Sequence, residues 1–218
     1  MNVGILGTGD LAVTLGRVWA AAGHPLSVTG RNGRRADEAA GRIGHAAAPV
    51  APAGFAARAD VVVVALPWEG LETGLSLVGG PRGALAGKTV LDCTNPVDYG
   101  TGTLKPATGS AAELVARTAA GAHVVKALHL FAGASWPYEG PRDTAPVVAL
   151  CGDEASALDH AAALVRDLGG RAAVVGGLDG SRQLEEAAGF VMRVVAAGHN
   201  PRFAVPDVDP AALRAATG

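Results

Sequence analysis

Residues 3–12 read Val3-Gly4-Ile5-Leu6-Gly7-Thr8-Gly9-Asp10-Leu11-Ala12, a short apolar run followed by a Gly-x-Gly-x-x-Ala turn. Gly7 permits a tight turn at the end of a strand, and Gly9 lets a pyrophosphate approach the backbone because it has no Cβ. Ala12 allows the following helix to pack closely on the sheet. An ordinary glycine-rich turn is the alternative, but a second strand follows at the required spacing. The segment therefore predicts a dinucleotide-binding βαβ unit.

Short strands alternate with helices through the first two thirds of the chain. The predicted strands cover residues 3–6, 26–29, 61–66, 88–93 and 124–128, with an ambiguous one within 45–52. The predicted helices cover residues 10–22, 32–42, 69–78 and 110–120. The uninterrupted run Val61-Val62-Val63-Val64-Ala65-Leu66 is typical of a strand covered on both faces. This order predicts an α/β fold with a doubly wound parallel sheet.

A Gly- and Pro-rich connection over residues 132–146 separates this part from a smaller set of elements. Strands are expected at 147–151 and 172–175, and helices at 154–168 and 181–197. We therefore predict a dinucleotide-binding domain over residues 1–143 and a small C-terminal α/β unit over residues 144–218, ending in a long helix.

The overall composition excludes several classes of protein. Of 218 residues, 49% are hydrophobic and 17% charged, which predicts a packed core. The net charge of −2 argues against general binding to nucleic acid. No apolar run approaches the ~20 residues of a membrane span, and the N-terminus lacks a signal-peptide pattern, so we expect a cytoplasmic protein. Cys93 and Cys151 have no metal-like spacing, and no metal site is expected.

The end of the second predicted strand distinguishes NAD from NADP. It reads Thr29-Gly30-Arg31-Asn32, and no acidic residue appears before Asp37. A carboxylate here would bind the ribose 2′-hydroxyl of NAD, whereas a guanidinium can bind the 2′-phosphate of NADP. Arg31 is the main candidate for that phosphate, supported by Arg34 or Arg35 and by the Thr29 hydroxyl. The alternative is that these arginines only solvate the start of a helix.

Several separated segments together resemble the F420-dependent NADP oxidoreductases, over almost the full chain. They are Gly7–Ala12, Gly30-Arg31 with Arg35, Leu66-Pro67-Trp68-Glu69, Thr94-Asn95-Pro96, Gly109-Ser110-Ala111-Ala112-Glu113, Lys126-Ala127-Leu128-His129, Cys151-Gly152-Asp153 and Ser181-Arg182. Three departures stand out. Gly30 replaces a frequent serine, Leu130-Phe131-Ala132 replaces an apolar-Pro stretch, and residues 183–186 are more acidic than expected.

The resemblance implies hydride transfer between the C4 atom of NADPH and the C5 atom of the deazaflavin coenzyme F420. Both rings would lie in a cleft at the carboxyl ends of the strands. This chemistry depends on positioning, so no catalytic triad is needed. His129 would donate to a ring carbonyl of the second substrate, although a histidine at a strand end is often structural. The expected cofactor-binding residues are Gly7, Thr8, Gly9, Asp10, Leu11, Thr29, Gly30, Arg31, Asn32, Arg35, Leu66, Pro67, Trp68, Asn95 and Pro96.

Other interpretations stay open. An imine or carbonyl reductase of the same fold would need a general acid, for which His129, Tyr138 or Asp92 are candidates. A non-catalytic NADPH-binding protein would keep only the first half of the site. Ser181 and Arg182, at the start of the last helix, would suit an anion, or would form a cap and a surface ion pair. The apolar surface of residues 184–197 predicts a homodimer through this helix.

Overall fold

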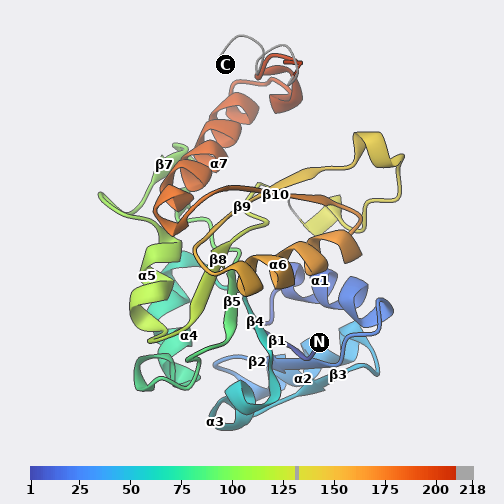
Figure 1. The fold of residues 1–218 in the computed structure, drawn as a ribbon, viewed down its shortest axis with the longest axis vertical. Helices are drawn as coiled ribbons and strands as arrows, with labels where there is room; N and C mark the ends of the chain where they lie inside the picture. Colours follow the sequence, from blue (N-terminus) through green and yellow to red (C-terminus); the bar gives the residue numbers. More distant parts are fainter. Residues whose placement is uncertain (131–132, 210–218) are drawn as a thin grey trace.

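The computed structural model describes residues 1–130 and 133–209, which form a doubly wound α/β structure (Figure 1). The main strands are β1 (Val3–Leu6), β2 (Leu26–Thr29), β3 (Ala47–Pro49), β4 (Val61–Val64), β5 (Thr89–Asp92), β8 (His123–Lys126), β9 (Val147–Gly152) and β10 (Arg171–Gly176). They form one sheet in the order β10-β9-β8-β5-β4-β1-β2-β3. All neighbours are parallel except β8 and β9. The predicted fold class is confirmed.

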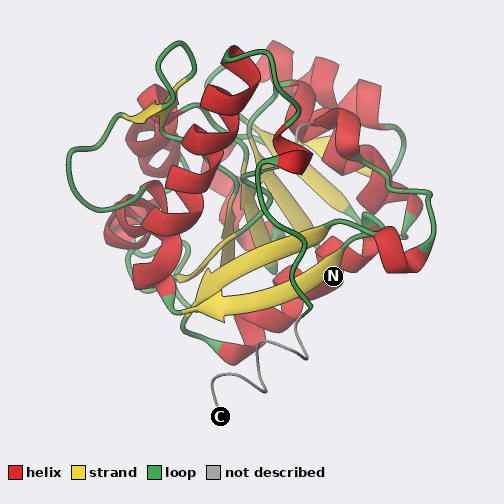
Figure 2. Cartoon of the chain, turned by 90° about the horizontal axis from the view of Figure 1, so that it is seen from above, coloured by secondary structure: helices red, strands yellow, loops and turns green. Residues whose placement is uncertain are grey.

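Helices cover both faces of the sheet (Figure 2). They are α1 (Asp10–Ala21), α2 (Gly33–Ile43), α3 (Pro52–Phe55), α4 (Leu71–Leu77), α5 (Ala111–Thr118), α6 (Ala155–Asp167) and α7 (Ser181–Ala196). Single 3-10 turns are η1 (Ala56–Arg58), η2 (Trp68–Gly70), η3 (Gly80–Arg82), η4 (Gly133–Ser135), η5 (Arg142–Thr144), η6 (Leu178–Gly180) and η7 (Pro201–Phe203). The interior of one face holds side chains from α1, α2 and α6, and that of the other holds side chains from α3, α4 and α5.

Few aromatic side chains contribute to this core, because aromatic residues make up only 4% of the chain. Trp19, in α1, is fully buried, and its indole Nε1 donates to the carbonyl of Leu164 in α6 at 3.0 Å. Phe55 is fully buried on the other face, beside β1. Most remaining core positions are Ala, Val and Leu, which let helices pack closely on a parallel sheet.

The C-terminal elements extend the first sheet rather than form a separate one. β9 continues the sheet beyond β8, and β10 forms its edge. The predicted division between residues 143 and 144 stays a prediction. α7 begins beside α5 and projects upward, and η7 follows it (Figure 1). It is the longest helix of the described residues, with 16 residues, and none of the helices in 1–130 and 133–209 has the length and apolar character to cross a membrane.

A small hairpin lies between β5 and α5. β6 (Val97–Asp98) pairs antiparallel with β7 (Thr103–Leu104). The carboxylate of Asp98 accepts the backbone N–H groups of Gly100 and Thr101 at 2.9 Å each, which turns the chain between the two strands. Strands of two residues are too short to show an alternating pattern, so they could not be predicted from hydrophobic periodicity.

Candidate active site

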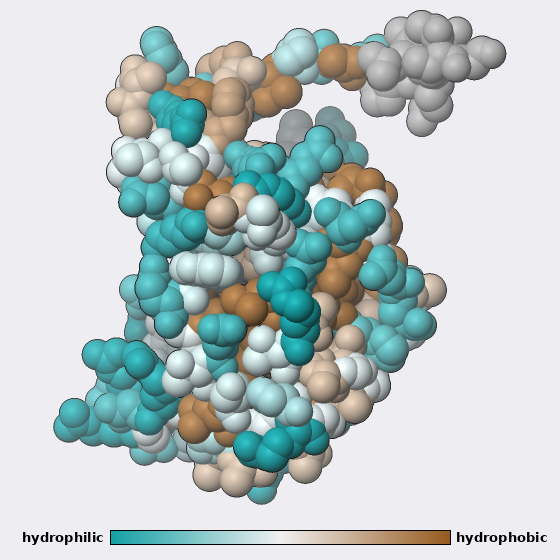
Figure 3. Space-filling model, turned by 90° about the vertical axis from the view of Figure 1, so that its left-hand side faces the viewer, coloured by the Kyte–Doolittle hydropathy of each residue, from teal (hydrophilic) through white to brown (hydrophobic). Residues whose placement is uncertain are grey.

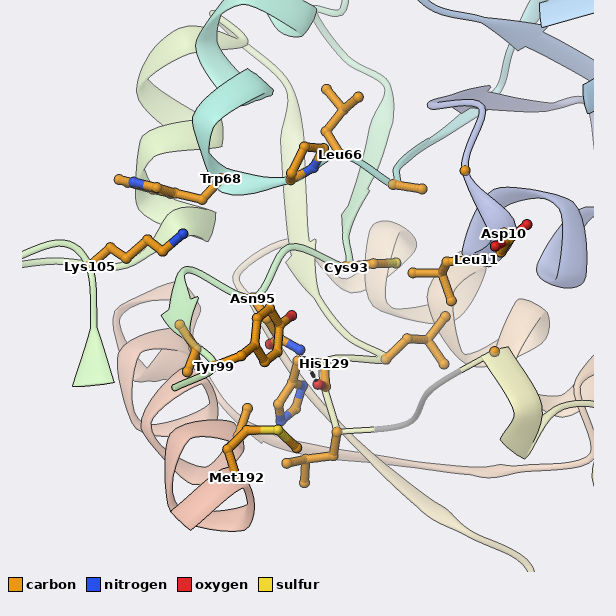
Figure 4. Close-up of a pocket in the computed structure, with 18 of the residues that line it drawn as sticks. Asp10, Leu11, Leu66, Trp68, Cys93, Asn95, Tyr99, Lys105, His129 and Met192 are labelled. Carbon is orange, nitrogen blue, oxygen red and sulfur yellow. Dashed lines mark hydrogen bonds between the residues drawn. The ribbon is translucent and has the colours of Figure 1, made fainter. Parts of the chain in front are cut away.

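A cleft of about 450 Å³ opens at the carboxyl ends of β1, β4, β5 and β8 (Figure 4). This is where ligands bind in open α/β sheets. Eight residues predicted from the sequence line it: Gly9, Asp10, Leu11, Leu66, Pro67, Trp68, Asn95 and His129. The cleft therefore lies between the Gly-rich turn after β1 and the segments that follow β4, β5 and β8.

The Gly-rich turn contains one crowded glycine and one open glycine. Gly7 has φ +144°, and a Cβ there would lie 2.3 Å from the carbonyl oxygen of Ala65. A Cβ on Gly9 would have nothing within 4 Å. Gly9 is also the N-cap of α1 and offers no side-chain cap to the helix amides. The start of α1 is thus open to an anion the size of a diphosphate, which fits the predicted cofactor.

The arginines that follow β2 lie on the surface. Arg31 and Arg35 are exposed, and within the described part of the chain neither forms an ion pair with a carboxylate. Arg34 approaches Glu38 at 4.0 Å. Asn32 caps α2 as predicted, accepting the Arg35 backbone N–H at 3.3 Å.

The structure corrects the role expected of the Thr29 hydroxyl. Thr29 is fully buried, and its Oγ1 donates to the carbonyl of Val50 at 2.8 Å. The hydroxyl therefore links the end of β2 to the segment after β3 and is not directed to a ligand. Gly30 lies beside Thr8. A Cβ on Gly30 would be 3.1 Å from the Thr8 Cγ2 atom.

Buried polar atoms without partners gather at the other end of the cleft. The amide Nδ2 of Asn95 donates to the carbonyl of His129 at 2.6 Å. Within residues 1–130 and 133–209, the Asn95 Oδ1 and both ring nitrogens of His129 have no hydrogen-bond partner. His129 is only 4% exposed. Buried polar groups are normally paired, so this set fits a ligand that carries hydrogen-bonding groups of its own.

His129 is an uncharged group in this environment. Burial lowers its pKa from the ordinary 6.5 to about 3, and the positive charge of Lys126 adds to the effect. Leu128, directly before it, has φ 60°. A non-glycine residue in the left-handed region is strained, and such residues cluster at ligand sites. This turn carries the chain from the end of β8 into the cleft.

The far wall of the cleft contains residues that the sequence analysis missed. Tyr99 and Lys105 come from the β6–β7 hairpin region, and Val191 and Met192 come from α7. Figure 4 shows Tyr99 and Met192 beside His129. Lys105 forms an ion pair with Glu69 at the rim. The apolar period of α7 was visible in the sequence, but nothing local showed that this helix returns to the strand ends.

Other predicted residues lie outside this cleft. Pro96 is buried and does not line the cleft. Ser181 is fully buried, and Arg182 donates to the carbonyl of Gly109 at 2.7 Å and to Glu186 at 2.9 Å. The interpretation of Arg182 as part of a surface ion pair therefore agrees with its contacts.

Two of the three candidate general acids are also outside the cleft. Asp92 is fully buried and pairs with Lys126 at 2.9 Å. The Tyr138 hydroxyl lies 2.6 Å from the Thr144 hydroxyl, in a different surface pocket. Leu130 lines the cleft, whereas Phe131 and Ala132, noted above as departures from the family, lie outside the described residues.

The first part of the chain, which supplies the Gly-rich turn of this site, matches a known protein family. Residues 2–96 match the family described as NADP oxidoreductase, coenzyme F420-dependent. The resemblance is confirmed. The match runs from the first strand to the Asn95-Pro96 turn and so covers the Gly-rich turn, the arginines and the segment after β4. No curated protein sequence matches the chain.

Solved structures extend the likeness over most of the chain. A candidate F420-dependent NADP reductase from Arthrobacter sp. FB24 is 26% identical, with a TM-score of 0.80, over 91% of this chain and 96% of that one. A reductive aminase from Aspergillus terreus, solved with NADPH and ethyl levulinate, is 20% identical with a TM-score of 0.65. An imine reductase from Myxococcus stipitatus, solved with NAD+, is 18% identical with a TM-score of 0.65.

The last two similarities show the fold alone. Each covers 90% of this chain but only 62% of the other protein, so the chain spans less than two thirds of their length. Taken with the family match, the comparisons support an enzyme of the NADP-dependent oxidoreductase class, as predicted.

Proposed function

We propose that the protein transfers a hydride between NADPH and the deazaflavin coenzyme F420. The observation that carries the proposal is the family match over residues 2–96, whose segments line a cleft continuing to His129 and α7. The neighbour from Arthrobacter sp. FB24, which covers nearly the full chain, supports the same substrate pair.

The first half of the site would hold NADPH. The open start of α1 at Gly9 would receive the diphosphate, with Thr8, Asp10 and Leu11 around it. The exposed guanidiniums of Arg31 and Arg35 would receive the 2′-phosphate, since they have no carboxylate competitor in the described residues.

The nicotinamide half of the cofactor fits the middle of the cleft. Leu66, Pro67 and Trp68 offer an apolar wall, and the Asn95 Oδ1 offers a free acceptor for an amide N–H. When bound, the cofactor supplies the hydride from C4. Pro96 would support the turn that carries Asn95.

The second substrate would occupy the end of the cleft bounded by His129, Tyr99 and Met192. The acceptor ring gains a hydride at C5 and a proton from water at a ring nitrogen, so NADPH, H⁺ and oxidised F420 give NADP⁺ and reduced F420. No protein acid is required at the reacting carbon. The neutral imidazole of His129 would donate one N–H to a ring carbonyl.

The direct test mixes the protein with NADPH, with and without F420, and follows the absorbance of both chromophores. We expect both bands to fall together in a one-to-one ratio. NADPH binding without any change in either band would overturn the F420 assignment and leave the NADPH assignment standing.

A second candidate is NADPH-dependent reduction of an imine or carbonyl compound, which the imine reductase fold neighbours favour. That reaction needs a proton donor as well as a hydride. Among the three candidates considered from the sequence, only His129 lines the cleft, and its pKa of about 3 leaves it unprotonated at neutral pH. Turnover of cyclic imines with NADPH, at rates exceeding those with F420, would favour this alternative.

The apolar surface of α7 supports the predicted homodimer. Phe190, Val195 and Phe203 are each at least half exposed on α7 and the turn after it. Apolar side chains gather on this arm at the top of Figure 3. Size-exclusion chromatography with light scattering would give the mass of a dimer. The substitution Phe190→Asp should shift that mass toward one chain, and a wild-type monomer would exclude the dimer.

A further inference from the structure

A lysine ammonium group lies fully buried under the floor of the cleft. Lys126 is 0% exposed, and its Nζ contacts the Asp92 carboxylate at 2.9 Å and the Glu185 carboxylate at 2.9 Å. Its third donor goes to the carbonyl of Thr94. All three N–H groups are therefore used, and the cation takes no part in lining the cleft.

The Asp92–Lys126 pair fixes the residue directly before Asn95. The Asp92 Oδ1 accepts the backbone N–H of Thr94 at 2.9 Å, and Lys126 donates to the carbonyl of the same residue. Thr94 is thus held through both of its backbone groups. Asn95 in turn holds the His129 carbonyl, so the orientation of both candidate ligand groups depends on this buried pair.

Glu185 extends the network to α7. Its carboxylate oxygens accept the Ala111 backbone N–H at 3.0 Å and the Ala112 backbone N–H at 3.3 Å, at the start of α5. Neighbouring carboxylates raise the pKa of Lys126 despite burial, and burial raises the pKa of Glu185 against the opposing effect of Lys126. One buried carboxylate therefore joins the base of α7 to β8 and to α5.

The hairpin is attached to α7 by close backbone contact. A Cβ on Gly189 would lie 2.4 Å from the Gly102 carbonyl oxygen, and a Cβ on Gly102 would lie 2.7 Å from the Gly189 carbonyl oxygen. Arg193 adds a hydrogen bond to the Thr101 carbonyl at 3.1 Å. The hairpin and α7 thus form one wall, and this wall carries Tyr99 and Met192.

We propose that Lys126 and Glu185 are positioning residues for the second substrate, because their buried ion pair seats the α7–hairpin wall over His129 and Asn95. The inference rests on the proposed function and adds to it the residues that set the geometry of the second half of the cleft. It also explains the unexpected acidity of residues 183–186, since Glu185 is the counter-charge of Lys126.

An ion pair of this kind is better suited to specifying geometry than to adding stability. Well-packed apolar residues often replace buried ion pairs without loss of stability, whereas removal of one partner leaves an uncompensated buried charge. Within α7, no residue beyond Gly189 is buried. The direction of α7 therefore depends on a few contacts near its base, with Glu185 among them, together with Ser181, Ala188 and Gly189.

The test compares Lys126→Met and Glu185→Gln with the control Leu164→Ala. Leu164 is fully buried in α6, on the opposite face of the sheet, and its truncation lowers stability without touching the network. Hydrogen–deuterium exchange of the free protein is measured by segment. NADPH affinity, and the KM and kcat for F420, are measured on the same samples.

We expect faster exchange over 97–104 and 185–196 in both network variants, with residues 3–21 unchanged. NADPH affinity should stay at the wild-type value, while kcat/KM for F420 falls by roughly 100-fold. The double variant Lys126→Met/Glu185→Gln should lose no more than Lys126→Met alone, because the two residues act as a unit. Leu164→Ala should lower Tm and leave the exchange pattern of α7 and kcat/KM unchanged.

Exchange in α7 that is unchanged, or raised equally in the control, would overturn the inference. Should Lys126→Met not fold, Glu185→Gln gives the same readouts. A wild-type protein that does not react with F420 would remove the proposed function, whereas the exchange pattern of the free protein would still decide whether the ion pair seats α7.

Discussion

The two halves of the cleft are built in different ways. The half proposed for the adenosine diphosphate part of NADPH comes from one continuous stretch, in which β1, the Gly7–Ala12 turn, α1 and β2 follow one another. The second half brings together the ends of β5 and β8, a hairpin of two-residue strands and a helix that begins at residue 181. The first is held by local backbone geometry and the second by long-range contacts, including a buried ion pair.

This difference explains how far prediction from sequence could reach. Gly7 and Gly9 reveal their roles because a turn places fixed demands on backbone conformation. The β-branched run over residues 61–64 likewise shows a buried strand in its composition alone. Tyr99 and Met192 carry no such sign, since their place in the cleft depends on where distant segments meet.

The role of Lys126 also depends on contacts between segments that are far apart in the sequence. Lys126 lies in β8 and does not line the cleft. Its effect on the site passes through Thr94 and Glu185, two residues that only the folded chain brings to it. The role predicted for the Thr29 hydroxyl was wrong for a related reason. This hydroxyl donates to the carbonyl of Val50, which lies 21 positions further along the chain.

The largest effect should come from replacing the crowded glycine. Gly7→Ala places a Cβ 2.3 Å from the Ala65 carbonyl oxygen at φ +144°, so the turn must shift. We expect a loss of about 1–3 kcal/mol in the free energy of unfolding and no measurable NADPH binding. Gly9→Ala, with open space around the new Cβ, should fold as wild type and only weaken NADPH binding. Equal stability losses in urea unfolding would break this distinction.

Arg31 should determine the preference between NADPH and NADH. A charge-assisted hydrogen bond contributes about 1.5–3 kcal/mol, so Arg31→Ala should weaken NADPH binding by roughly 10- to 150-fold and leave NADH binding unchanged. Arg34→Ala is the matched control, because that guanidinium already faces Glu38. Titration of both cofactors into each variant measures the ratio. Equal losses for NADPH and NADH would contradict a 2′-phosphate contact.

The second half should respond to acid through His129. Above pH 6.5 the imidazole is neutral in folded and unfolded chains, so it contributes no pH dependence. As pH falls from 6.5 toward 3, the unfolded chain binds a proton that the folded chain does not, and stability decreases. The slope for one proton is about 1.4 kcal/mol per pH unit. Urea unfolding of wild type and His129→Leu between pH 6 and 4.5 should show a flatter profile for the variant, and parallel profiles would mean that His129 titrates normally.

The smallest effect should come from the rim, where Lys105 pairs with Glu69 on the open side of the cleft. Each group shifts the pKa of the other, lowering that of Glu69 and raising that of Lys105. Because both are solvated, the pair adds little to stability, and Lys105→Met should leave Tm unchanged.

The same substitution sharpens the contrast between the halves, because Lys105 comes from the hairpin region and lines the cleft. A cation beside an acceptor ring favours the electron density that arrives with a hydride. Lys105→Met should therefore lower kcat for F420 by a small factor, more at low than at high ionic strength, and leave the NADPH affinity unaltered. Stopped-flow measurement of the hydride step at two salt concentrations separates this from a change in binding. A loss in NADPH affinity instead would mean that the rim serves the cofactor, and that the two halves are less independent than their construction indicates.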